Sequence, residues 1–391
     1  MKKKSLKDCE LIGKKILLRV DFNVPMTEKG EIRDDTRIKL CLPTIEYLLN
    51  SNCSIIIISH FGRPNGSFAD KYSLAPCAKR LSELLKHNVK FGPYPYNNQL
   101  KEKIKKLQKK EIILLENLRF NVAEEKPHLD LNFAKDLSTL ADVYVNDAFG
   151  SSHRSHSSVV EITKYFNNTS LMGLLLEKEI FHLKKVISSP NKPFYTIIGG
   201  AKLGSKLGVL KTLIEKVDAM FIGGGMAYTF FKAMGISIGQ SIVDLDKLEY
   251  AKMLIQETQS SSAPKIQLPI DCVITDGKKI KTIDISNGIP DGWEGMDIGE
   301  KTVEKWSNIL MRGSTIFWNG PLGVFEDPNF AQGTKNLAMA LSKNSNDVII
   351  GGGDLVAAIG TLHSKLNFTH ISSGGGACLE FIEKGSLPGI T

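Results

Sequence analysis

The sequence predicts an α/β protein with two lobes, each a mostly parallel sheet flanked by helices in a Rossmann-like arrangement, joined by a helix and a hinge. Short β-branched runs alternate with amphipathic stretches along the whole chain, which is the pattern of repeated βα units. The length of 391 residues suggests two domains, since a domain has about 150 residues on average. The composition also changes near the middle of the chain, which places a boundary there.

The change in composition separates an arginine-rich first part from a glycine-rich second part. Residues 1–190 hold 31 Lys and Arg against 22 Asp and Glu, together with 7 of the 8 arginines and 7 of the 34 glycines. Residues 191–391 hold 19 basic and 20 acidic residues and 27 glycines. Either two modules drifted apart, or one part holds an anion with guanidinium groups while the other approaches a ligand with bare backbone.

In the first part, each predicted strand runs into polar residues. The four strands are residues 15–20, 54–58, 112–115 and 142–145, and the polar segments after them are residues 21–25, 59–64, 116–120 and 146–150. Ligands of open α/β sheets bind beyond the carboxyl ends of the strands. The polar segments therefore lie where a ligand would bind.

Basic side chains gather in these segments or in the loops after strands: Arg37, Arg63, Arg119 and Arg154, with His60, His153 and His156. A single surface arginine is usually a solvated charge, and His60 alone could be a buried core histidine. So many basic groups at one edge would repel one another without an anion between them. Guanidinium groups bind carboxylate and phosphate through paired hydrogen bonds, so the pattern favours an anion site that includes His60.

Between the two parts, residues 171–190 predict a connecting helix. Leu176, Ile180, Leu183 and Ile187 follow the spacing of one helix face, and Pro190 ends the helix. The sequence has no long Gly-, Ser- or Pro-rich tether. We therefore expect a helical connection between the lobes and not a flexible linker.

In the second part, four predicted strands end in glycine. Apolar runs lead into glycine clusters within residues 196–202, 220–225, 348–354 and 370–376. Glycine permits a sharp turn and lets the next helix present its N–H groups and positive dipole end to a phosphate. Lys202 and Lys206 are one helical turn apart and would face the same way. This part therefore predicts a phosphate site made of backbone N–H groups and lysine.

Three motifs that would indicate other functions fit poorly. No strand-end glycine cluster completes G-x-G-x-x-G, which disfavours a dinucleotide dehydrogenase. Gly199-x4-Gly204-Ser205-Lys206 narrowly misses the P-loop pattern. Gly235-Ile-Ser-Ile-Gly239 fits the hydrolase pattern G-x-S-x-G, but residues 226–234 predict a helix that Gly235 caps, whereas that motif follows a strand.

Other features exclude several classes of protein. The lysine-rich run 101–110 lacks aromatic residues and carries Ile104 and Leu107 at helical spacing, so it predicts a solvated helix face and no nucleic-acid partner. No apolar run approaches the roughly 18 residues of a membrane span, and no secretory signal is recognisable. The six cysteines are scattered, without a C-x-x-C pair. We therefore expect buried thiols in a cytoplasmic protein with no membrane partner.

Motifs in a fixed order along the chain carry a resemblance to a known family. They are Arg19-Val-Asp-Phe-Asn-Val-Pro25, Asp34-Asp-Thr-Arg-Ile38, Ser59-His-Phe-Gly-Arg-Pro64, Glu116-Asn-Leu-Arg-Phe120, Asn146-Asp-Ala-Phe-Gly150 with His153-Arg-Ser-His156, Gly199-Gly-Ala-Lys202, Leu268-Pro-Ile-Asp271, Phe317-Trp-Asn-Gly-Pro-Leu-Gly-Val-Phe-Glu326, Gly351-Gly-Gly-Asp354 and Gly374-Gly-Gly-Ala377. Over nearly its full length the chain resembles the phosphoglycerate kinases.

The resemblance implies reversible, glycolytic phosphoryl transfer between 1,3-bisphosphoglycerate and ADP, giving 3-phosphoglycerate and ATP, with Mg²⁺ on the nucleotide. It implies that the acid is bound by Asp21, Asn23, Arg37, His60, Phe61, Gly62, Arg63, Arg119 and Arg154. It implies that the nucleotide is bound by Lys206, Gly295, Glu326, Gly352, Gly353, Asp354 and Leu355, with Asp354 also meeting the magnesium. Arg37 and Lys202 would face the phosphoryl group during transfer.

The resemblance also implies a domain assignment. Residues 1–172, with a C-terminal tail of about residues 378–391 that returns to the first lobe, would form the acid-binding domain, and residues 173–377 the nucleotide-binding domain. A monomer is expected. Two alternatives remain open: another bilobal kinase that acts on a carboxylate, and a nucleotide-binding module without turnover.

One departure from the family pattern lies in the expected nucleotide site. Leu355 stands where family members usually have Ser or Thr. The family hydroxyl could contribute a side-chain hydrogen bond, or the position could matter only for its backbone N–H in the turn after Gly351-Gly-Gly-Asp354. Leucine keeps the N–H and loses the hydroxyl, so we favour the backbone role.

Overall fold

The computed structural model describes residues 4–94, 96, 98–259, 265–343, 345–362 and 366–390. The chain divides into two compact units: unit 1 comprises Met1–Phe181 with Ser386–Thr391, and unit 2 comprises His182–Gly385. The first division falls within helix α5 (Leu174–Ser188), which confirms the helix predicted at the junction. The outer ends of the predicted first domain, Met1 and Thr391, lie outside the described residues.

Unit 1 is built on a parallel sheet. Its strands are β1 (Lys4–Ser5), β2 (Lys15–Arg19), β3 (Ser54–Ile58), β4 (Val89–Gly92), β5 (Ile112–Leu115), β6 (Val143–Asn146) and β7 (Ser170–Met172). They lie in the order β1-β7-β6-β2-β3-β5-β4, and every pair is parallel. The four strands predicted to end in polar residues are β2, β3, β5 and β6. These four are neighbours in the middle of the sheet, so their carboxyl ends meet along one edge.

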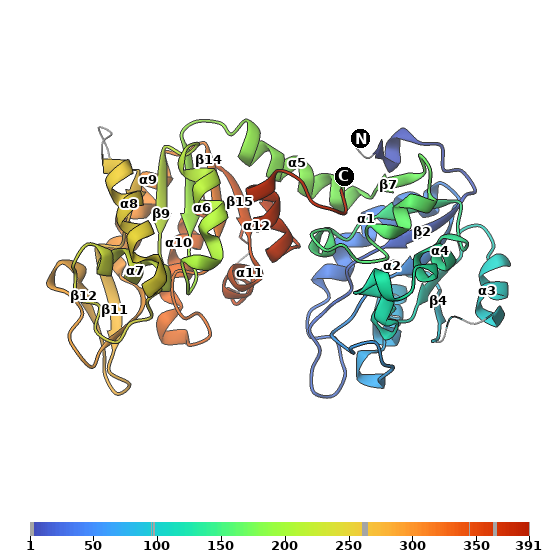
Figure 1. Cartoon of the computed structure of the whole chain (residues 1–391), viewed down its shortest axis with the longest axis horizontal. Helices are drawn as coiled ribbons and strands as arrows, with labels where there is room; N and C mark the ends of the chain where they lie inside the picture. The colour runs from blue at the N-terminus through green and yellow to red at the C-terminus, as the bar shows by residue number, and fades with distance from the viewer. Residues whose placement is uncertain are drawn as a thin grey trace. The chain divides into compact units, whose positions relative to one another are not determined.

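Alternation along the strands of unit 1 gives the sheet two apolar faces. Ile55 and Ile57 of β3 belong to one core cluster, whereas Ile56 and Ile58 belong to another. Helices α1 (Thr36–Asn50) and α2 (Ala75–Leu85) cover the first face, and α3 (Asn98–Lys105) and α4 (Asn132–Ser138) cover the second (Figure 1). A sheet covered on both faces confirms the predicted layers, and the buried Ile104 confirms the apolar side of the lysine-rich helix.

Unit 2 contains a second parallel sheet. Its strands are β8 (Phe194–Ile198), β9 (Ala219–Ile222), β10 (Ile266–Gln267), β14 (Thr315–Asn319), β15 (Asp347–Gly351) and β16 (His370–Ile371), in the order β10-β9-β8-β14-β15-β16. The helices of this unit are α6 (Leu207–Ile214), α7 (Gly225–Ala233), α8 (Leu248–Gln259), α9 (Glu300–Leu310), α10 (Gln332–Ser342), α11 (Gly353–Gly360) and α12 (Gly375–Lys384). Apolar residues of α9, α10 and α11 cover one face of the sheet. All four predicted glycine-ended strands lie in this sheet.

A three-stranded antiparallel sheet in unit 2 was not predicted. It consists of β11 (Asp271–Thr275), β12 (Ile280–Asp284) and β13 (Glu294–Ile298) in the order β12-β11-β13. Asp276-Gly277 opens the turn between the first two strands, and Asp-Gly between two strand-like runs is a hairpin signal. This sheet packs against α7 through a cluster that contains Tyr228, Phe231 and Ile274 (Figure 1).

Three further expectations can be compared with the described part of the chain. No helix there is long and apolar enough to cross a membrane. None of the six cysteines, all of which lie in the described residues, forms a disulfide; five are buried and Cys9 is partly buried. The helix predicted before Gly235 is α7, and Gly235 follows its last turn with a φ of +81°, as a C-terminal glycine does. The G-x-S-x-G match is therefore no nucleophile turn.

Candidate active site

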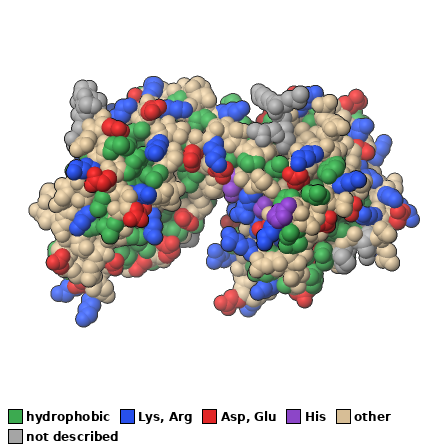
Figure 2. Space-filling model, in the orientation of Figure 1, with side chains coloured by type: hydrophobic (Ala, Val, Ile, Leu, Met, Phe, Trp, Pro, Cys, Tyr) green, Lys and Arg blue, Asp and Glu red, His purple; other side chains and the backbone are tan. Residues whose placement is uncertain are grey.

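The carboxyl edge of the unit 1 sheet brings most of the predicted acid-binding residues together. Asp21 and Asn23 follow β2, His60, Phe61 and Gly62 follow β3, Arg119 follows β5, and Arg154 lies beyond β6. Arg37 enters from the first turn of α1. Arg63 is exposed directly after Gly62, and Arg154 is half-buried. Figure 2 shows histidine and basic side chains lying next to one another on the surface of this unit.

Asp21 stands at the centre of this group. Its Oδ1 accepts hydrogen bonds from Arg37 Nη1 at 2.9 Å and from the Asn23 backbone N–H at 3.1 Å, and it lies 4.0 Å from His60 Nε2. Burial opposes ionisation of this carboxyl group, but the basic groups around it, His60, Arg37 and Arg19, hold its pKa below the usual value. Asp21 is therefore an ionised acceptor that aligns Arg37.

Arg119 is almost completely buried and only partly satisfied. Its Nη1 donates to the Gly62 carbonyl at 2.6 Å, and its Nη2 lies 3.0 Å from Glu125 Oε1. Among the described residues, its Nε has no hydrogen-bond partner. The Gly62 N–H in turn donates to Asn23 Oδ1 at 2.9 Å. A buried donor without a partner is costly, so the site still has a hydrogen bond to offer to an anion.

Two buried polar residues of this edge were quoted in motifs but given no role. Asn117, fully buried, accepts from the N–H groups of Phe61 (3.0 Å) and Arg119 (3.1 Å) and donates to the carbonyls of Phe61 (2.6 Å) and Tyr72 (3.0 Å). The side chain of Asn117 therefore uses all its donors and acceptors to hold the backbone of the loops after β3 and β5. Arg19, the last residue of β2, is also fully buried. A polar residue directly at a buried strand end was the sequence signal for both.

The predicted nucleotide residues line two adjoining cavities of unit 2. One, of about 390 Å³, is lined by Gly295 and Glu326, and the other, of about 490 Å³, by Lys202, Lys206, Gly352, Gly353, Asp354 and Leu355. Gly200, Ala201, Pro321 and Asp354 line both, so the two cavities form one continuous hollow. The structure thus brings all the predicted nucleotide residues to the carboxyl ends of β8, β14 and β15 and to β13.

Lys206 is held at the inner end of this hollow. Its Nζ donates to the backbone carbonyl of Asn319 at 3.2 Å and also to the Asn319 side-chain oxygen. Burial lowers the pKa of Lys206 to about 8, although Asp354 pulls it upward. Asn319 was missed as a site residue; it is the last residue of β14, where a polar side chain follows the apolar run Ile316-Phe-Trp318. Lys202, by contrast, is exposed.

The turn before α11 combines backbone freedom with a buried anchor. Gly352 has a φ of +101°, which L side chains rarely adopt, and it precedes the first residue of the helix. Asp354 is exposed, whereas Leu355 has 0% exposure and packs into the core with Ile350 and Ile359. The N–H groups of this first helical turn lack intrahelical partners. The turn therefore presents amides and one carboxylate to the cavity while its leucine points into the core.

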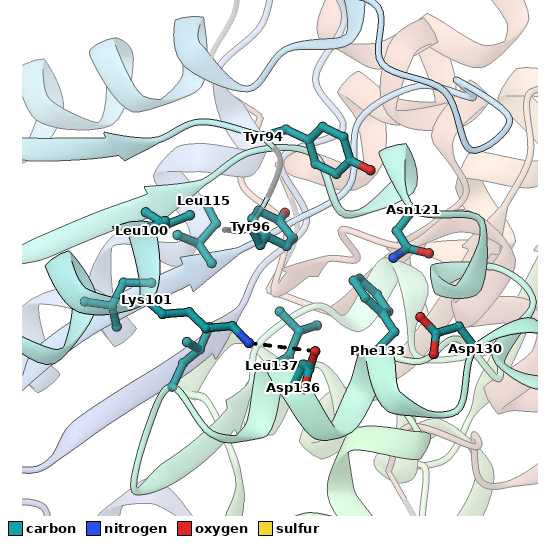
Figure 3. Close-up of a pocket in the computed structure, with 12 residues that line it drawn as sticks. Tyr94, Tyr96, Leu100, Lys101, Leu115, Asn121, Asp130, Phe133, Asp136 and Leu137 are labelled. Carbon is teal, nitrogen blue, oxygen red and sulfur yellow. Dashed lines mark ion pairs between the residues drawn. The ribbon is translucent and has the colours of Figure 1, made fainter. Parts of the chain in front are cut away.

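A third hollow in unit 1 has a different character. It is an apolar cavity of about 220 Å³ between α3 and α4, lined by Tyr94, Tyr96, Leu100, Phe133 and Leu137 among others (Figure 3). Several of its polar groups already have partners: Lys101 lies 3.8 Å from Asp136, and the Tyr96 hydroxyl donates to the Glu116 carbonyl. We therefore regard it as part of the core packing.

Comparison with known proteins assigns the family. The phosphoglycerate kinase family model matches residues 6–385. The phosphoglycerate kinases of Thermosipho africanus and Koribacter versatilis are 46% and 47% identical to this chain, covering 100% of it and 97% and 98% of their own lengths. The solved structure of phosphoglycerate kinase from Coxiella burnetii superposes with a TM-score of 0.87 at 34% identity, covering 99% of this chain and 98% of that one.

The fold and these relatives define an enzyme that transfers a phosphoryl group to and from a carboxylate. The chain belongs to the phosphoglycerate kinase family. Its reaction is the glycolytic, reversible transfer between 1,3-bisphosphoglycerate and ADP, which gives 3-phosphoglycerate and ATP.

Proposed function

We propose that the carboxyl edge of the unit 1 sheet binds the phosphoglycerate and that the hollow of unit 2 binds the nucleotide with Mg²⁺. The observation that carries this proposal is the contrast in donors: guanidinium and imidazole groups at the first edge, and glycine amides around a half-buried lysine at the second. Both edges lie where open α/β sheets bind ligands. We therefore propose that each of the two predicted domains binds one of the two substrates.

On unit 1, we assign the phosphate that is not transferred to Arg63, Arg119 and Arg154. Guanidinium groups hold phosphate through paired hydrogen bonds, and the buried Arg119 has an Nε–H left to donate. Asp21, Asn23, His60 and the Phe61–Gly62 backbone would hold the carboxylate and hydroxyl end of the acid. Arg37, aligned by Asp21, would face the phosphoryl group that moves.

On unit 2, the hollow has a polar part and an apolar part. Lys206 and the amides of Gly352, Gly353 and Leu355 would bind phosphate oxygens. Ile242, Met296 and Val324 line the other part, beside Gly295 and Glu326, so a base would lie there with its ribose hydroxyls on Glu326. Lys202, exposed at the mouth, would meet the transferred group.

Asp354 fits a magnesium ion that arrives with the nucleotide. Its exposed carboxylate lines the same cavity as Lys206 and the glycine amides. Mg²⁺ is usually held by one or two carboxylates together with substrate phosphates and water. When bound, the ion would neutralise charge on the phosphate oxygens.

The chemistry requires positioning and charge neutralisation more than covalent assistance. A carboxylate has no proton to lose before it attacks, so no general base is needed and none is assigned. Arg37, Lys202 and the helix amides would stabilise the charge on the equatorial oxygens in the transition state. We further propose that the enzyme is a monomer and that it is cytoplasmic; the cytoplasmic location is in keeping with six cysteines that form no disulfide.

A coupled assay with 3-phosphoglycerate and Mg-ATP tests the proposal. Turnover that saturates in both substrates is expected, and it should stop on chelation of Mg²⁺. Turnover with another carboxylate but not with 3-phosphoglycerate would favour a different carboxylate kinase. Nucleotide binding without turnover on any acid would favour a binding module and contradict the proposed assignment.

A further inference from the structure

Arg19 lies beneath the proposed acid site and touches one of its residues directly. The side chain is fully buried, and Nη2 lies 3.1 Å from Nδ1 of His60. Its other two nitrogens also have partners: Nε donates to Ser158 Oγ at 2.9 Å, and Nη1 donates to the Val20 carbonyl. Glu124 Oε1, itself fully buried, lies 3.8 Å from Nη2 and balances the charge. The guanidinium group therefore has one fixed orientation.

The chemistry of guanidinium decides which nitrogen of His60 carries the proton. Arginine has five N–H donors, no acceptor, and does not lose its proton in proteins. The Nδ1 atom that it faces must therefore accept, so Nδ1 has no hydrogen. In a neutral imidazole the single proton is then on Nε2. A proton on Nδ1 would set two donors face to face and cost the hydrogen bond.

The remaining nitrogen, Nε2, faces the proposed acid site. It lies 4.0 Å from Asp21 Oδ1, which is too long for a hydrogen bond. That oxygen already accepts from Arg37 and from the Asn23 N–H. The Nε2 proton is thus left for an acceptor at this edge of the sheet.

We propose that Arg19 is a positioning residue that fixes His60 as the neutral tautomer with its proton on Nε2. His60 then acts as a hydrogen-bond donor to an oxygen of the phosphoglycerate at every pH at which the enzyme works, neither gaining charge nor turning into an acceptor. The hydrogen bond from His60 to the phosphoglycerate rests on the proposed function, which places the acid beside His60. The tautomer of His60 does not depend on that function.

The charged groups around His60 support a neutral ring. Burial lowers its pKa well below 6.5, and of the neighbours that face it only Asp21, from the loop after β2, acts in the opposite direction. Arg19 from β2, Arg119 from the turn after β5 and His156 from the segment after β6 all disfavour a second proton. The hydrogen bond from Arg19 and the surrounding charge thus favour the same state.

Nitrogen NMR of the histidine side chains in the full-length enzyme tests the tautomer. We expect a pyridine-type Nδ1 and a pyrrole-type Nε2 for His60, unchanged between about pH 5.5 and 8. A proton on Nδ1, or an imidazolium that forms in this range, would overturn the proposal.

Variants separate positioning from mere structural support. The double variant Arg19→Met/Glu124→Gln removes the donor and its balancing charge together, and Glu124→Gln alone is the matched control. In the double variant we expect His60 to show mixed tautomers or a measurable titration, and KM for 3-phosphoglycerate to rise about ten-fold, the equivalent of about 1.4 kcal/mol. KM for the nucleotide should not change in either protein. An unaltered His60 spectrum in a folded double variant would contradict the role of Arg19.

One more variant distinguishes a failure of the tautomer assignment from a failure of the proposed function. If the wild-type spectrum shows the expected tautomer but His60→Ala leaves KM for 3-phosphoglycerate unchanged, the tautomer stands and the placement of the acid at His60 fails. If the double variant does not fold, the wild-type spectrum alone still decides the tautomer.

Discussion

The two sheets end in sites that use opposite means for the same purpose. At the carboxyl edge of unit 1, the proposed anion-binding groups are long side chains, and two of them contact an orienting neighbour: Arg37 donates to Asp21, and Arg19 faces His60. In unit 2 the same edge is largely backbone, with Gly352 at a φ of +101° and the lysine Lys206 held by Asn319. A parallel sheet edge thus fixes where a ligand binds but not the type of group that binds it.

The difference determines which changes each site tolerates. A side-chain site fails when a side chain is shortened or its support is removed, since the backbone beneath it stays in place. A backbone site fails when a side chain is added, because a Cβ either strains the turn or fills the space of the ligand.

The largest effect is expected for Arg37→Ala. If Arg37 neutralises charge that develops only during transfer, its loss should lower kcat by about 10²–10³, as removal of one such donor typically does. Arg63→Ala, at the proposed site of the phosphate that is not transferred, should raise KM for the acid and change kcat little. Steady-state kinetics on both variants measure the two constants. Equal losses of kcat would show that the two arginines do not divide the work in this way.

For the backbone site, the informative change is Gly320→Ala. Gly320 has a φ of +90°, and an added Cβ would lie 2.7 Å from Lys206 Nζ and closer still to the Gly199 carbonyl. We expect KM for the nucleotide to rise at least about ten-fold and stability to fall by more than about 1 kcal/mol, with KM for the acid unchanged. Kinetics and denaturant unfolding measure both.

Gly360→Ala is the matched control for that variant. A Cβ at Gly360, the last residue of α11, meets nothing within 4 Å. Alanine in a helix is favoured over glycine by roughly 0.5–1 kcal/mol, so this variant should be slightly more stable and bind the nucleotide normally. Similar losses in the two variants would show that unit 2 is merely sensitive to substitution, and the backbone interpretation would fail.

Sequence reasoning reached the βα pattern, the parallel sheets, the connecting helix and the grouping of residues at each edge, because these follow from local periodicity and from the rule that strand ends meet. It missed β11–β13, because the short strand Ile280–Asp284 is polar and mostly exposed and carries little periodic signal. It also left Arg19 and Asn117 without roles. Which buried polar groups meet depends on contacts between distant segments, such as Asn117 with Phe61, and no local pattern encodes them.

A smaller effect is expected from pH. Because burial lowers the pKa of Lys206 to about 8, this lysine is charged at pH 7 and loses its proton as pH rises through about 8 to 9. KM for the nucleotide should therefore rise about five-fold between pH 7.5 and 9, while the acid site, whose shifted Asp21 and His60 titrate below 6.5, stays constant. Nucleotide binding at pH 8.5 should take up protons in calorimetry, and no uptake would argue against Lys206 as a phosphate ligand.

The lowered pKa of Lys206 also makes the stability of the free enzyme depend on pH, with a sign opposite to that of the effect on nucleotide binding. The folded state disfavours the charged form of Lys206, so its contribution without ligand is unfavourable below about pH 8 and is relieved between about 8 and 10.5. The contribution of Lys206 to the stability of the free enzyme should therefore increase with pH in that window, while nucleotide affinity decreases.

The smallest kinetic effect is expected at Leu355, where the chain departs from the family. Its side chain has 0% exposure and packs with Ile350 and Ile359, so only its backbone N–H faces the cavity. Leu355→Ser should move KM for the nucleotide by less than about three-fold and leave kcat within about two-fold, because a neutral hydrogen bond contributes only roughly 0.5–1.5 kcal/mol. Truncation in the core should nevertheless cost about 2–5 kcal/mol of stability.

Leu355→Ala separates the hydroxyl from the cavity that both variants create. Alanine removes the same apolar packing without adding a donor, so the difference between the two variants in nucleotide KM reports the hydroxyl alone. We expect the two to agree within about two-fold, since the amide that is proposed to bind the phosphate is present in both. A serine variant that binds nucleotide about ten-fold more tightly than the alanine variant would show that a side-chain donor is missing here. In that case the nucleotide site of unit 2 would depend on a side chain in the way the site of unit 1 does, and the contrast between the two edges would be weaker at this turn.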